Sequence, residues 1–362
     1  CIRDSMVTIF HWDLPQYLEE KGGWLNRDTC VAYTHYAKVC FERFGDRVKL
    51  WATFNEPRYY TNSGYLIGNY PPGHQDIQET VTASYYMMLA SAMAVEAFRT
   101  GGYDGQIGIE HSFSPVYTTD TSVESAIARR FADNFYNNWI LDTAAIGEIP
   151  GDLLGELKKT CDLSMMTPED LAVIRQNRVD YLGLNYYARV MVKPYESGET
   201  TLIVNNQGKK AKGTSQTIIK GWFEQVRPES SRYTEWDTEI FPEGLYEGIR
   251  QVWNKYHLPI YITENGIGLY EDTSVNQVED DDRIEFMDMH IAAVLKAKEG
   301  GCDVRGYYAW SPFDLYSWKN GTEKRYGLVT IDYENGLERR PKKSYYWYKD
   351  VIETDGKHIT EK

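Results

Sequence analysis

The sequence of 362 residues lacks a long hydrophobic run, a glycine-rich phosphate loop and an excess of basic residues. A membrane-spanning helix needs about 20 predominantly apolar residues in a row, and no stretch of this chain is that apolar. The glycine fingerprint of dinucleotide-binding folds is also missing. The net charge of −14 argues against nucleic acid or an anionic membrane as a partner.

Cysteine is scarce, and its positions do not have the spacing of a metal site. The five cysteines are Cys1, Cys30, Cys40, Cys161 and Cys302. We expect reduced thiols in the core of a cytosolic protein, because disulfides persist mainly in oxidising compartments. Cys30 and Cys40 fall within one expected helix and lie too far apart along it to be bridged.

Short apolar runs alternate with helical or loop segments along the chain. These expected strands lie near Met6, Leu50, Ile107, Tyr181, Tyr261 and Arg305. Such alternation is typical of a parallel sheet, and functional residues at the carboxyl ends of the strands are typical of a (β/α)8 barrel. We therefore expect the α/β class, a (β/α)8 TIM barrel and a single domain over residues 1–362. A doubly wound open sheet is the alternative, but no phosphate-binding motif supports it.

Helical periodicity and capping residues predict the segments between the strands. The expected helices run from Asn26 to Gly45, over about 77–99 and 122–141, from Thr167, from Pro242, and over 280–298. Residues 193–235 are polar and have no clear period, which predicts a long surface excursion. The acidic residues 279–282 predict a solvated helix start rather than a metal site.

Two of the expected strands end on a glutamate that is followed by a strand-breaking residue. The motifs are Thr53-Phe54-Asn55-Glu56-Pro57 and Ile262-Thr263-Glu264-Asn265-Gly266. Either glutamate alone is compatible with a loop carboxylate that caps the next helix. A pair of carboxyl groups suits glycosidic-bond cleavage, in which one protonates the leaving oxygen and the other attacks the anomeric carbon.

These motifs resemble the two signature motifs of the retaining β-glycosidases of glycoside hydrolase family 1. The resemblance implies that Glu56 is the general acid/base and Glu264 the nucleophile, with no metal and no cofactor. It extends from the third barrel strand to the C-terminus. The first two strand–helix units have no counterpart here, nor do the family's sugar-binding Gln and nucleophile-binding Arg. We expect the 362 residues to be part of a longer chain; the alternative is a fragment that folds poorly, because an open barrel leaves two sheet edges bare.

The resemblance also implies roles for residues near the strand ends. His11 would donate to sugar hydroxyls, Asn55 would bind the 2-hydroxyl, and Tyr187 would donate to the nucleophile. The further sugar-binding candidates are Trp12, Asn185, Trp310 as a platform under the sugar ring, and Trp318. Each has a plainer alternative, such as a histidine paired within its loop or an aromatic side chain that packs in the core.

The mechanism requires the two glutamates to differ in pKa. The nucleophile must be ionised and the acid protonated at neutral pH. A hydrogen bond from Tyr187 would lower the pKa of Glu264, and the resulting negative charge would raise the pKa of Glu56. Retention requires the two carboxyl groups to lie about 5–5.5 Å apart.

A phosphate-binding set follows the last expected strand. Family members that act on plain sugars usually carry Glu in place of Ser317, and a carboxylate there would repel a 6-phosphate. Ser317 offers a hydroxyl, Lys324 a point cation and Tyr326 a phenolic donor. This set resembles the phosphate-binding set of the 6-phospho-β-glycosidases. The alternative is a β-glucosidase with an altered loop.

The sequence therefore predicts retaining hydrolysis of 6-phospho-β-glucosides, such as a phosphorylated β-disaccharide or an aryl β-glucoside 6-phosphate. Trp318 keeps 6-phospho-β-galactosidase activity or dual specificity open as an alternative. A non-phospho β-glucosidase is another, and a non-catalytic domain that binds glycans or a protein partner is an alternative of a different class. Because such substrates arise during phosphotransferase uptake, the resemblance implies a bacterial cytoplasm. A homo-oligomer is compatible with the sequence.

Overall fold

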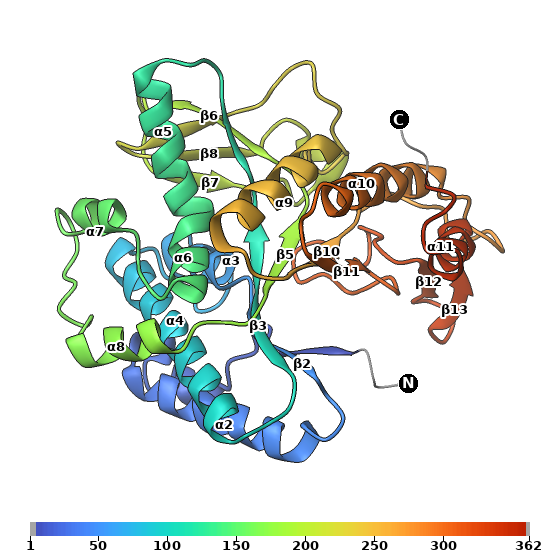
Figure 1. Cartoon of the computed structure of the whole chain (residues 1–362). Helices are drawn as coiled ribbons and strands as arrows, with labels where there is room; N and C mark the ends of the chain where they lie inside the picture. The colour runs from blue at the N-terminus through green and yellow to red at the C-terminus, as the bar shows by residue number, and fades with distance from the viewer. Residues whose placement is uncertain (1–4, 360–362) are drawn as a thin grey trace. The chain divides into compact units, whose positions relative to one another are not determined.

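All six predicted strands are present in the computed structural model, which describes residues 5–359 (Figure 1). Packing divides the chain into two units. The first consists of Cys1–Phe113, Arg130–Asn185 and Tyr256–Ile260, and the second of Ser114–Arg129, Tyr186–Lys255 and Tyr261–Lys362. Each unit therefore draws on distant parts of the sequence.

The first unit contains a parallel sheet. Its strands, in spatial order, are β1 (Met6–Phe10), β2 (Leu50–Asn55), β3 (Gln106–Phe113) and β5 (Leu182–Tyr186). Strands β1 and β2 pair in parallel, as do β2 and β3. An irregularity between Ala52 and Asn55 shifts the register, so that Asn55 lies opposite Glu110 on β3. A register shift of this kind re-aims the side chains that follow it.

Three of the helices of the first unit begin with a side-chain cap. Its α-helices are α1 (Gln16–Glu19), α2 (Arg27–Phe44), α3 (Pro57–Thr61), α4 (Ile77–Thr100), α6 (Trp139–Ala145), α7 (Gly151–Leu157) and α8 (Pro168–Gln176). The Asn26 side chain accepts from the backbone N–H of Asp28, and Asp76 does the same for Glu79 at the start of α4. Such caps satisfy backbone donors that have no partner within the helix.

The helix predicted over 122–141 is interrupted. It consists of α5 (Val123–Asp133), a π-helical turn (Asn134–Asn138) and then α6. The hydrophobic period alone could not reveal this interruption, because the turn continues in the same direction with only its hydrogen bonds changed.

The second unit contains the other two predicted strands, β10 (Ile260–Asn265) and β11 (Val304–Ala309), which are neighbours. Its remaining elements around the core are α9 (Pro242–Tyr256), α10 (Asp281–Glu299), β12 (Val329–Asp332), β13 (Glu338–Pro341) and α11 (Lys343–Glu353). Phe286, Met287 and Ile291 of α10 pack with Ile267 and Leu328 in one buried cluster. The cluster fixes α10 against the segments that follow β10 and precede β12.

The polar excursion predicted over 193–235 is not irregular. The second unit holds a five-stranded sheet of β4 (Val116–Thr118), β6 (Val190–Pro194), β9 (Phe223–Val226), β8 (Gln216–Ile219) and β7 (Thr201–Ile203), in that spatial order. Strand β6 pairs antiparallel with β9, as β8 does with β7 and β9. Strands of three to five residues leave too short a pattern for detection from sequence, and their stability comes from pairing.

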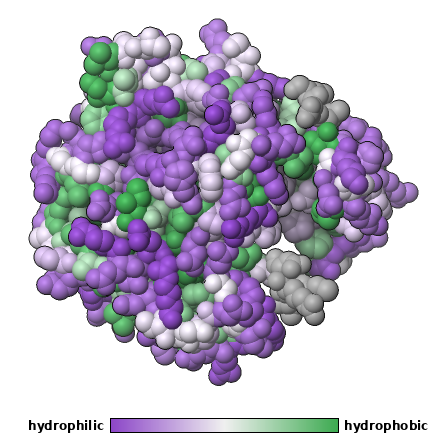
Figure 2. Space-filling model, in the orientation of Figure 1, coloured by the Kyte–Doolittle hydropathy of each residue, from purple (hydrophilic) through white to green (hydrophobic). Residues whose placement is uncertain are grey.

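Hydrophilic side chains cover most of the face shown in Figure 2. Within residues 5–359, the structure contains no helix long and apolar enough to cross a membrane.

Cys30, Cys161 and Cys302 are buried, whereas Cys40 is partly exposed, so the expectation of a core position is wrong for Cys40. These four thiols are free, and Cys1 lies outside the described residues.

Candidate active site

The first unit joins Glu56 to three of the other predicted residues through hydrogen bonds. The Asn185 amide donates to Asn55 Oδ1 at 2.9 Å and to Glu56 Oε1 at 3.0 Å. Asn55 Nδ2 lies within hydrogen-bonding distance of His11 Nε2, at 3.1 Å. Three strand ends, those of β1, β2 and β5, therefore supply one continuous polar cluster.

The backbone around this cluster is held in an unusual conformation. Glu56 has a φ of 47° and Trp12 a φ of 77°. A residue other than glycine that adopts a positive φ costs on the order of 1 kcal/mol, and such residues are found most often at functional sites. Trp12 Nε1 donates to the Asn55 carbonyl at 3.0 Å, and its ring stacks on Tyr59 with centroids 5.7 Å apart. These contacts fix the turn that presents Glu56.

Burial is the largest influence on the pKa of Glu56. Its side chain is buried, and burial raises the pKa of its carboxyl group above the usual value. The hydrogen bond from Asn185 and the positive charge of Arg58 oppose this shift without cancelling it. A raised pKa suits a group that must begin the reaction protonated. Burial also lowers the pKa of His11, with Asp13 opposing, which favours a neutral imidazole.

The second unit places Glu264 at the end of β10 with its predicted partner. The Tyr187 hydroxyl donates to Glu264 Oε2 at 2.7 Å. A donor at this distance stabilises the ionised carboxylate. The next residue, Asn265, is fully buried; its amide donates to the Tyr186 carbonyl at 2.7 Å and its oxygen accepts from the Tyr307 hydroxyl at 2.7 Å. The end of β10 is therefore rigidly bonded on both sides.

Gly266, the glycine of the second motif, is required for steric reasons. A Cβ atom on Gly266 would lie 1.9 Å from the carbonyl oxygen of Trp310. The backbone N–H of Trp310 donates to the Asn265 carbonyl at 2.9 Å, and a cis peptide bond joins Trp310 to Ser311. Because only glycine permits this approach, the motif around Glu264 also positions Trp310.

Lys324 and Tyr326 of the predicted phosphate set lie together. The Lys324 ammonium is 5.1 Å from the centroid of the Tyr326 ring and 4.9 Å from that of Trp236. Burial lowers the pKa of Lys324 to about 8. Among the described residues, no carboxylate pairs with this ammonium. A Cβ atom on Gly268 would lie 2.4 Å from Lys324 Cε, so the glycine leaves space for the lysine stem.

Ser317 and Trp318 occupy a tight turn in the same unit. The backbone of Ser317 exchanges two hydrogen bonds of 2.8 Å with Gly321. Its hydroxyl accepts from the backbone N–H groups of Lys319 and Asn320, each at 3.3 Å. The side chain of Trp318 is 56% exposed. In this structure the Ser317 hydroxyl therefore binds its own turn, and the indole beside it is accessible.

A buried cation fixes the backbone at Tyr326. Arg283, which is 1% exposed, donates to the carbonyls of Ile267 at 2.7 Å and Tyr326 at 2.9 Å. It also forms ion pairs with Glu271 at 2.5 Å and Asp280 at 2.8 Å. The predicted solvated helix start is therefore wrong for Asp280, which is buried because it pairs with Arg283; the other members of the acidic run are exposed.

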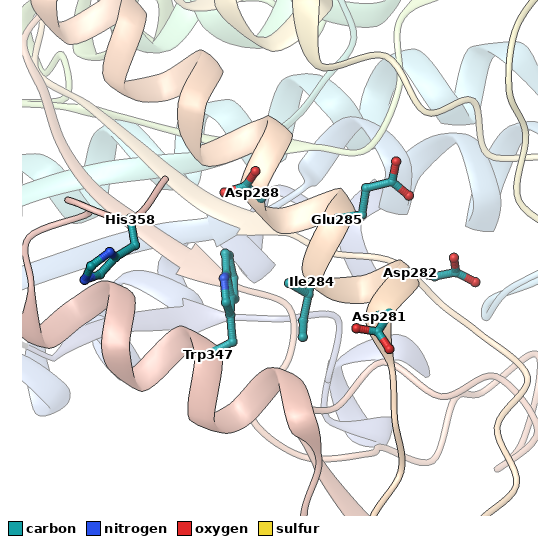
Figure 3. A pocket seen from close by; sticks show the side chains of 7 residues that line it. All are labelled: Asp281, Asp282, Ile284, Glu285, Asp288, Trp347 and His358. Atoms are coloured by element: carbon teal, nitrogen blue, oxygen red, sulfur yellow. The ribbon is translucent and has the colours of Figure 1, made fainter. Parts of the chain in front are cut away.

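A separate open pocket of about 380 Å³ lies at α10 (Figure 3). It is lined by Asp281, Asp282, Ile284, Glu285, Asp288, Trp347 and His358. Its carboxylates have cationic neighbours, such as Lys343 at 2.8 Å from Asp281 and Arg232 at 3.0 Å from Glu285. None of the catalytic, sugar-binding or phosphate-binding residues predicted from sequence lines this pocket. Within the part of the chain that the structure describes, no cluster of His, Cys, Asp and Glu has the arrangement of a metal site.

Three residues beside these clusters were not singled out from the sequence: Arg58, Glu110 and Trp236. Trp236 directly follows the region predicted to be a polar excursion, residues 193–235, and no pattern pointed to it. Glu110 carried a weak signal, because it is a charged residue that directly follows the apolar residues Ile107 and Ile109 of β3. Its environment depends on β1, about a hundred residues away in sequence, and could not be read locally.

The chain matches the family model described as glycosyl hydrolase family 1 over residues 3–357. It is 38% identical over 367 residues to a 6-phospho-beta-galactosidase of Clostridium acetobutylicum, covering 97% of this chain and 76% of that protein. It is 36% identical over 364 residues to the aryl-phospho-beta-D-glucosidase BglC of Bacillus subtilis, covering 98% and 76%. Among solved structures, a beta-glucosidase from Exiguobacterium marinum has a TM-score of 0.86 and 33% identity, covering 97% of this chain and 75% of that one. These matches confirm the α/β class and the barrel-type fold predicted from strand–helix order.

Proposed function

Because the chain belongs to glycosyl hydrolase family 1, we propose that it hydrolyses 6-phospho-β-glucosides with retention of configuration. The observation that carries the phosphate requirement is Lys324, a buried ammonium that contacts aromatic rings and has no carboxylate partner among the described residues. A phosphate dianion would supply the missing counter-charge. Two relatives whose names specify phosphorylated glycosides support the same reading.

In this proposal, Glu56 acts first as a general acid and then as a general base. Its proton goes to the glycosidic oxygen while the Glu264 carboxylate attacks the anomeric carbon, so the alcohol leaves and a glycosyl-enzyme forms. Glu56, now ionised, takes a proton from water, and the water oxygen attacks the same carbon. The sugar 6-phosphate is released and both glutamates return to their starting states.

The surrounding residues have distinct proposed roles. Tyr187 keeps Glu264 ionised through its 2.7 Å hydrogen bond. Asn55 and His11 bind sugar hydroxyls, and Asn185 orients Glu56. The proposed indole contacts to the sugar are Trp12, Trp310 and Trp318. The contacts of Asn55 and His11 with sugar hydroxyls strengthen as the sugar ring flattens toward the transition state.

The proposed phosphate site combines Lys324 with hydroxyl donors from Ser317 and Tyr326. A sugar phosphate is mostly dianionic at neutral pH, because its second pKa is about 6. Lys324 remains mostly protonated below its pKa of about 8. Both charges are therefore present between about pH 6 and 8. For Ser317 to bind phosphate, its hydroxyl must leave or share the bonds within its turn.

Two alternatives have support of their own. The Clostridium relative and the presence of Trp318 favour activity on 6-phospho-β-galactosides, alone or as dual specificity. The Exiguobacterium structure favours a plain β-glucosidase. The proposed substrates are a phosphorylated β-disaccharide or an aryl β-glucoside 6-phosphate, the proposed location is a bacterial cytoplasm, and nucleic acid and membrane are not proposed partners.

The deciding experiment compares kcat/KM for p-nitrophenyl β-glucoside, its 6-phosphate and the corresponding galactoside 6-phosphate. We expect a large preference for the glucoside 6-phosphate. A higher value for the galactoside 6-phosphate would reassign the sugar. Equal values with and without phosphate would overturn the phosphate site, and binding of glucose 6-phosphate without turnover of any substrate would favour a binding domain.

A further inference from the structure

The segment that carries Glu264 is bonded twice to the segment that carries Tyr187. Asn265, the residue after Glu264, is fully buried, and its amide donates to the Tyr186 carbonyl at 2.7 Å. Tyr186 immediately precedes Tyr187, whose hydroxyl donates to Glu264 Oε2 at 2.7 Å. Two consecutive residues of one segment therefore bind two consecutive residues of the other.

The carbonyl bound by Asn265 belongs to the peptide group that leads into Tyr187. A peptide group is planar, so the position of its oxygen fixes the direction in which the chain continues to the next Cα atom. The Tyr186 side chain is anchored as well, because its hydroxyl donates to the Phe241 carbonyl at 2.6 Å. The ring of Tyr186 is thus held by one segment and its carbonyl by another, and together they fix where the Tyr187 side chain begins.

Tyr307 of β11 determines which way the Asn265 amide faces. Its hydroxyl donates to Asn265 Oδ1 at 2.7 Å, and burial raises the pKa of Tyr307 well above its usual value, so the hydroxyl keeps its proton. The Tyr186 carbonyl can only accept a hydrogen bond. If the amide were reversed, Asn265 Oδ1 would face that carbonyl with no proton between the two acceptors. Only the observed orientation satisfies all three groups.

We propose that Tyr307 and Asn265 are positioning residues that hold the Tyr187 hydroxyl at hydrogen-bonding distance from Glu264. Tyr307 acts through the Asn265 amide, which in turn holds the peptide group that precedes Tyr187. This inference rests on the proposed role of Glu264 as the nucleophile, and it extends the group that prepares the nucleophile to the neighbouring strand β11. A purely structural tyrosine would stabilise β11 to the same extent whether or not Tyr187 were present.

Tyr307→Phe removes the hydroxyl and keeps the ring, which packs against the buried cluster that includes Phe286. Asn265 Oδ1 then loses its donor, and a buried acceptor without a partner is costly, so the amide is no longer held in one orientation. Tyr348→Phe is the matched control. The Tyr348 hydroxyl lies 3.4 Å from the Tyr307 backbone carbonyl, and the two ring centroids are 6.5 Å apart. This control removes a neighbouring phenolic hydroxyl without changing the bonds of Asn265.

The first test is a double-mutant cycle on kcat/KM with Tyr307→Phe, Tyr187→Phe and the double variant, on p-nitrophenyl β-glucoside and its 6-phosphate. We expect Tyr307→Phe alone to lower kcat/KM by about 3- to 10-fold on both substrates, the factor that corresponds to one ordinary hydrogen bond. In the Tyr187→Phe background the same change should cost less than about 2-fold, because the bond that it positions is already absent. Tyr348→Phe should change little in either background. Losses that simply multiply, in variants of normal melting temperature, would overturn the proposal.

A second measurement does not depend on turnover and so separates this inference from the proposed function. Crystal structures of the resting Tyr307→Phe and Tyr348→Phe enzymes give the distance from the Tyr187 hydroxyl oxygen to Glu264 Oε2. We expect it to exceed about 3.0 Å, the upper limit of an ordinary O–H···O hydrogen bond, in Tyr307→Phe. It should stay near 2.7 Å in Tyr348→Phe. A longer distance with unchanged rates would uphold the positioning and overturn Glu264 as the nucleophile. An unchanged distance in Tyr307→Phe would overturn the inference, whatever the rates show.

Discussion

Tyr187 donates its phenolic proton to Oε2 of Glu264 at 2.7 Å. This bond stabilises the carboxylate before a substrate arrives, and it must weaken when Glu264 forms a covalent bond to sugar. In the proposed mechanism, the tyrosine favours the ionised form of Glu264 and also the later return of its carboxylate as a leaving group.

For Tyr187→Phe, we predict a fall in kcat/KM by roughly 10- to 100-fold, because a hydrogen bond to a charged group is worth about 1.5–3 kcal/mol. The acidic limb of the pH profile should move to higher pH, since the carboxylate loses a donor that favours ionisation. Steady-state rates across pH 4–9 check both effects. Tyr17→Phe, which removes the hydroxyl of an exposed tyrosine, serves as the control.

Glu264→Gln and Glu56→Gln should fail in different ways. The first removes the nucleophile, so turnover of every substrate should be abolished while the melting temperature stays within a few degrees. The second removes the proton donor, so a phosphorylated disaccharide should suffer far more than a p-nitrophenyl glycoside, whose leaving group needs little protonation. Equal losses on the two substrates would argue against Glu56 as the acid.

Lys324→Met should reduce kcat/KM for the phosphorylated glucoside by at least about 10-fold, because the charge-assisted bonds to phosphate are lost. The unphosphorylated glucoside should change little. In the unaltered enzyme, the preference for phosphate should decline as the pH rises through about 8, where Lys324 loses its proton. Lys324→Arg should keep the preference to higher pH; a decline at the same pH in that variant would show that another group controls it.

Gly268→Ala should impair the phosphorylated substrate selectively. The added methyl group would lie 2.4 Å from Lys324 Cε, so the lysine stem must move. We expect KM for the glucoside 6-phosphate to rise several-fold, with a smaller change for the unphosphorylated glucoside. Gly155→Ala is the matched control, because a Cβ atom there meets nothing within 4 Å.

Arg283→Met should destabilise the fold more than it alters chemistry. It leaves Asp280 buried without its cation and leaves Glu271 with Lys342 as its other cation; breaking a buried ion pair typically costs about 3–5 kcal/mol. The exposed pair of Arg305 with Asp303 provides the contrast, since exposed pairs contribute about 0–1 kcal/mol. Chemical denaturation of Arg283→Met and Arg305→Met measures both, and equal losses would contradict the importance of burial.

The sequence located the strands because short apolar runs mark them, such as Leu182–Leu184 in β5 and Ile260–Ile262 in β10. It also located Glu56 and Glu264, since strand-breaking residues follow both. The five-stranded sheet that includes β6–β9 escaped detection, because strands of three to five polar-flanked residues gain stability only from their partners. Glu110 was not identified for a related reason: its contacts are with Thr8 and Glu56, and neither residue is close to it in sequence.

The close contact at Gly266 joins Trp310, the proposed sugar platform, to the segment that carries Glu264, the proposed nucleophile. With no Cβ between them, the Trp310 backbone lies directly against the segment that follows Glu264 and is hydrogen-bonded to Asn265. A displacement of the Trp310 indole would therefore also displace the Glu264 carboxylate. Under the proposed function, substitutions that change how tightly a sugar stacks on Trp310 should also change how well the anomeric carbon is aligned with Glu264.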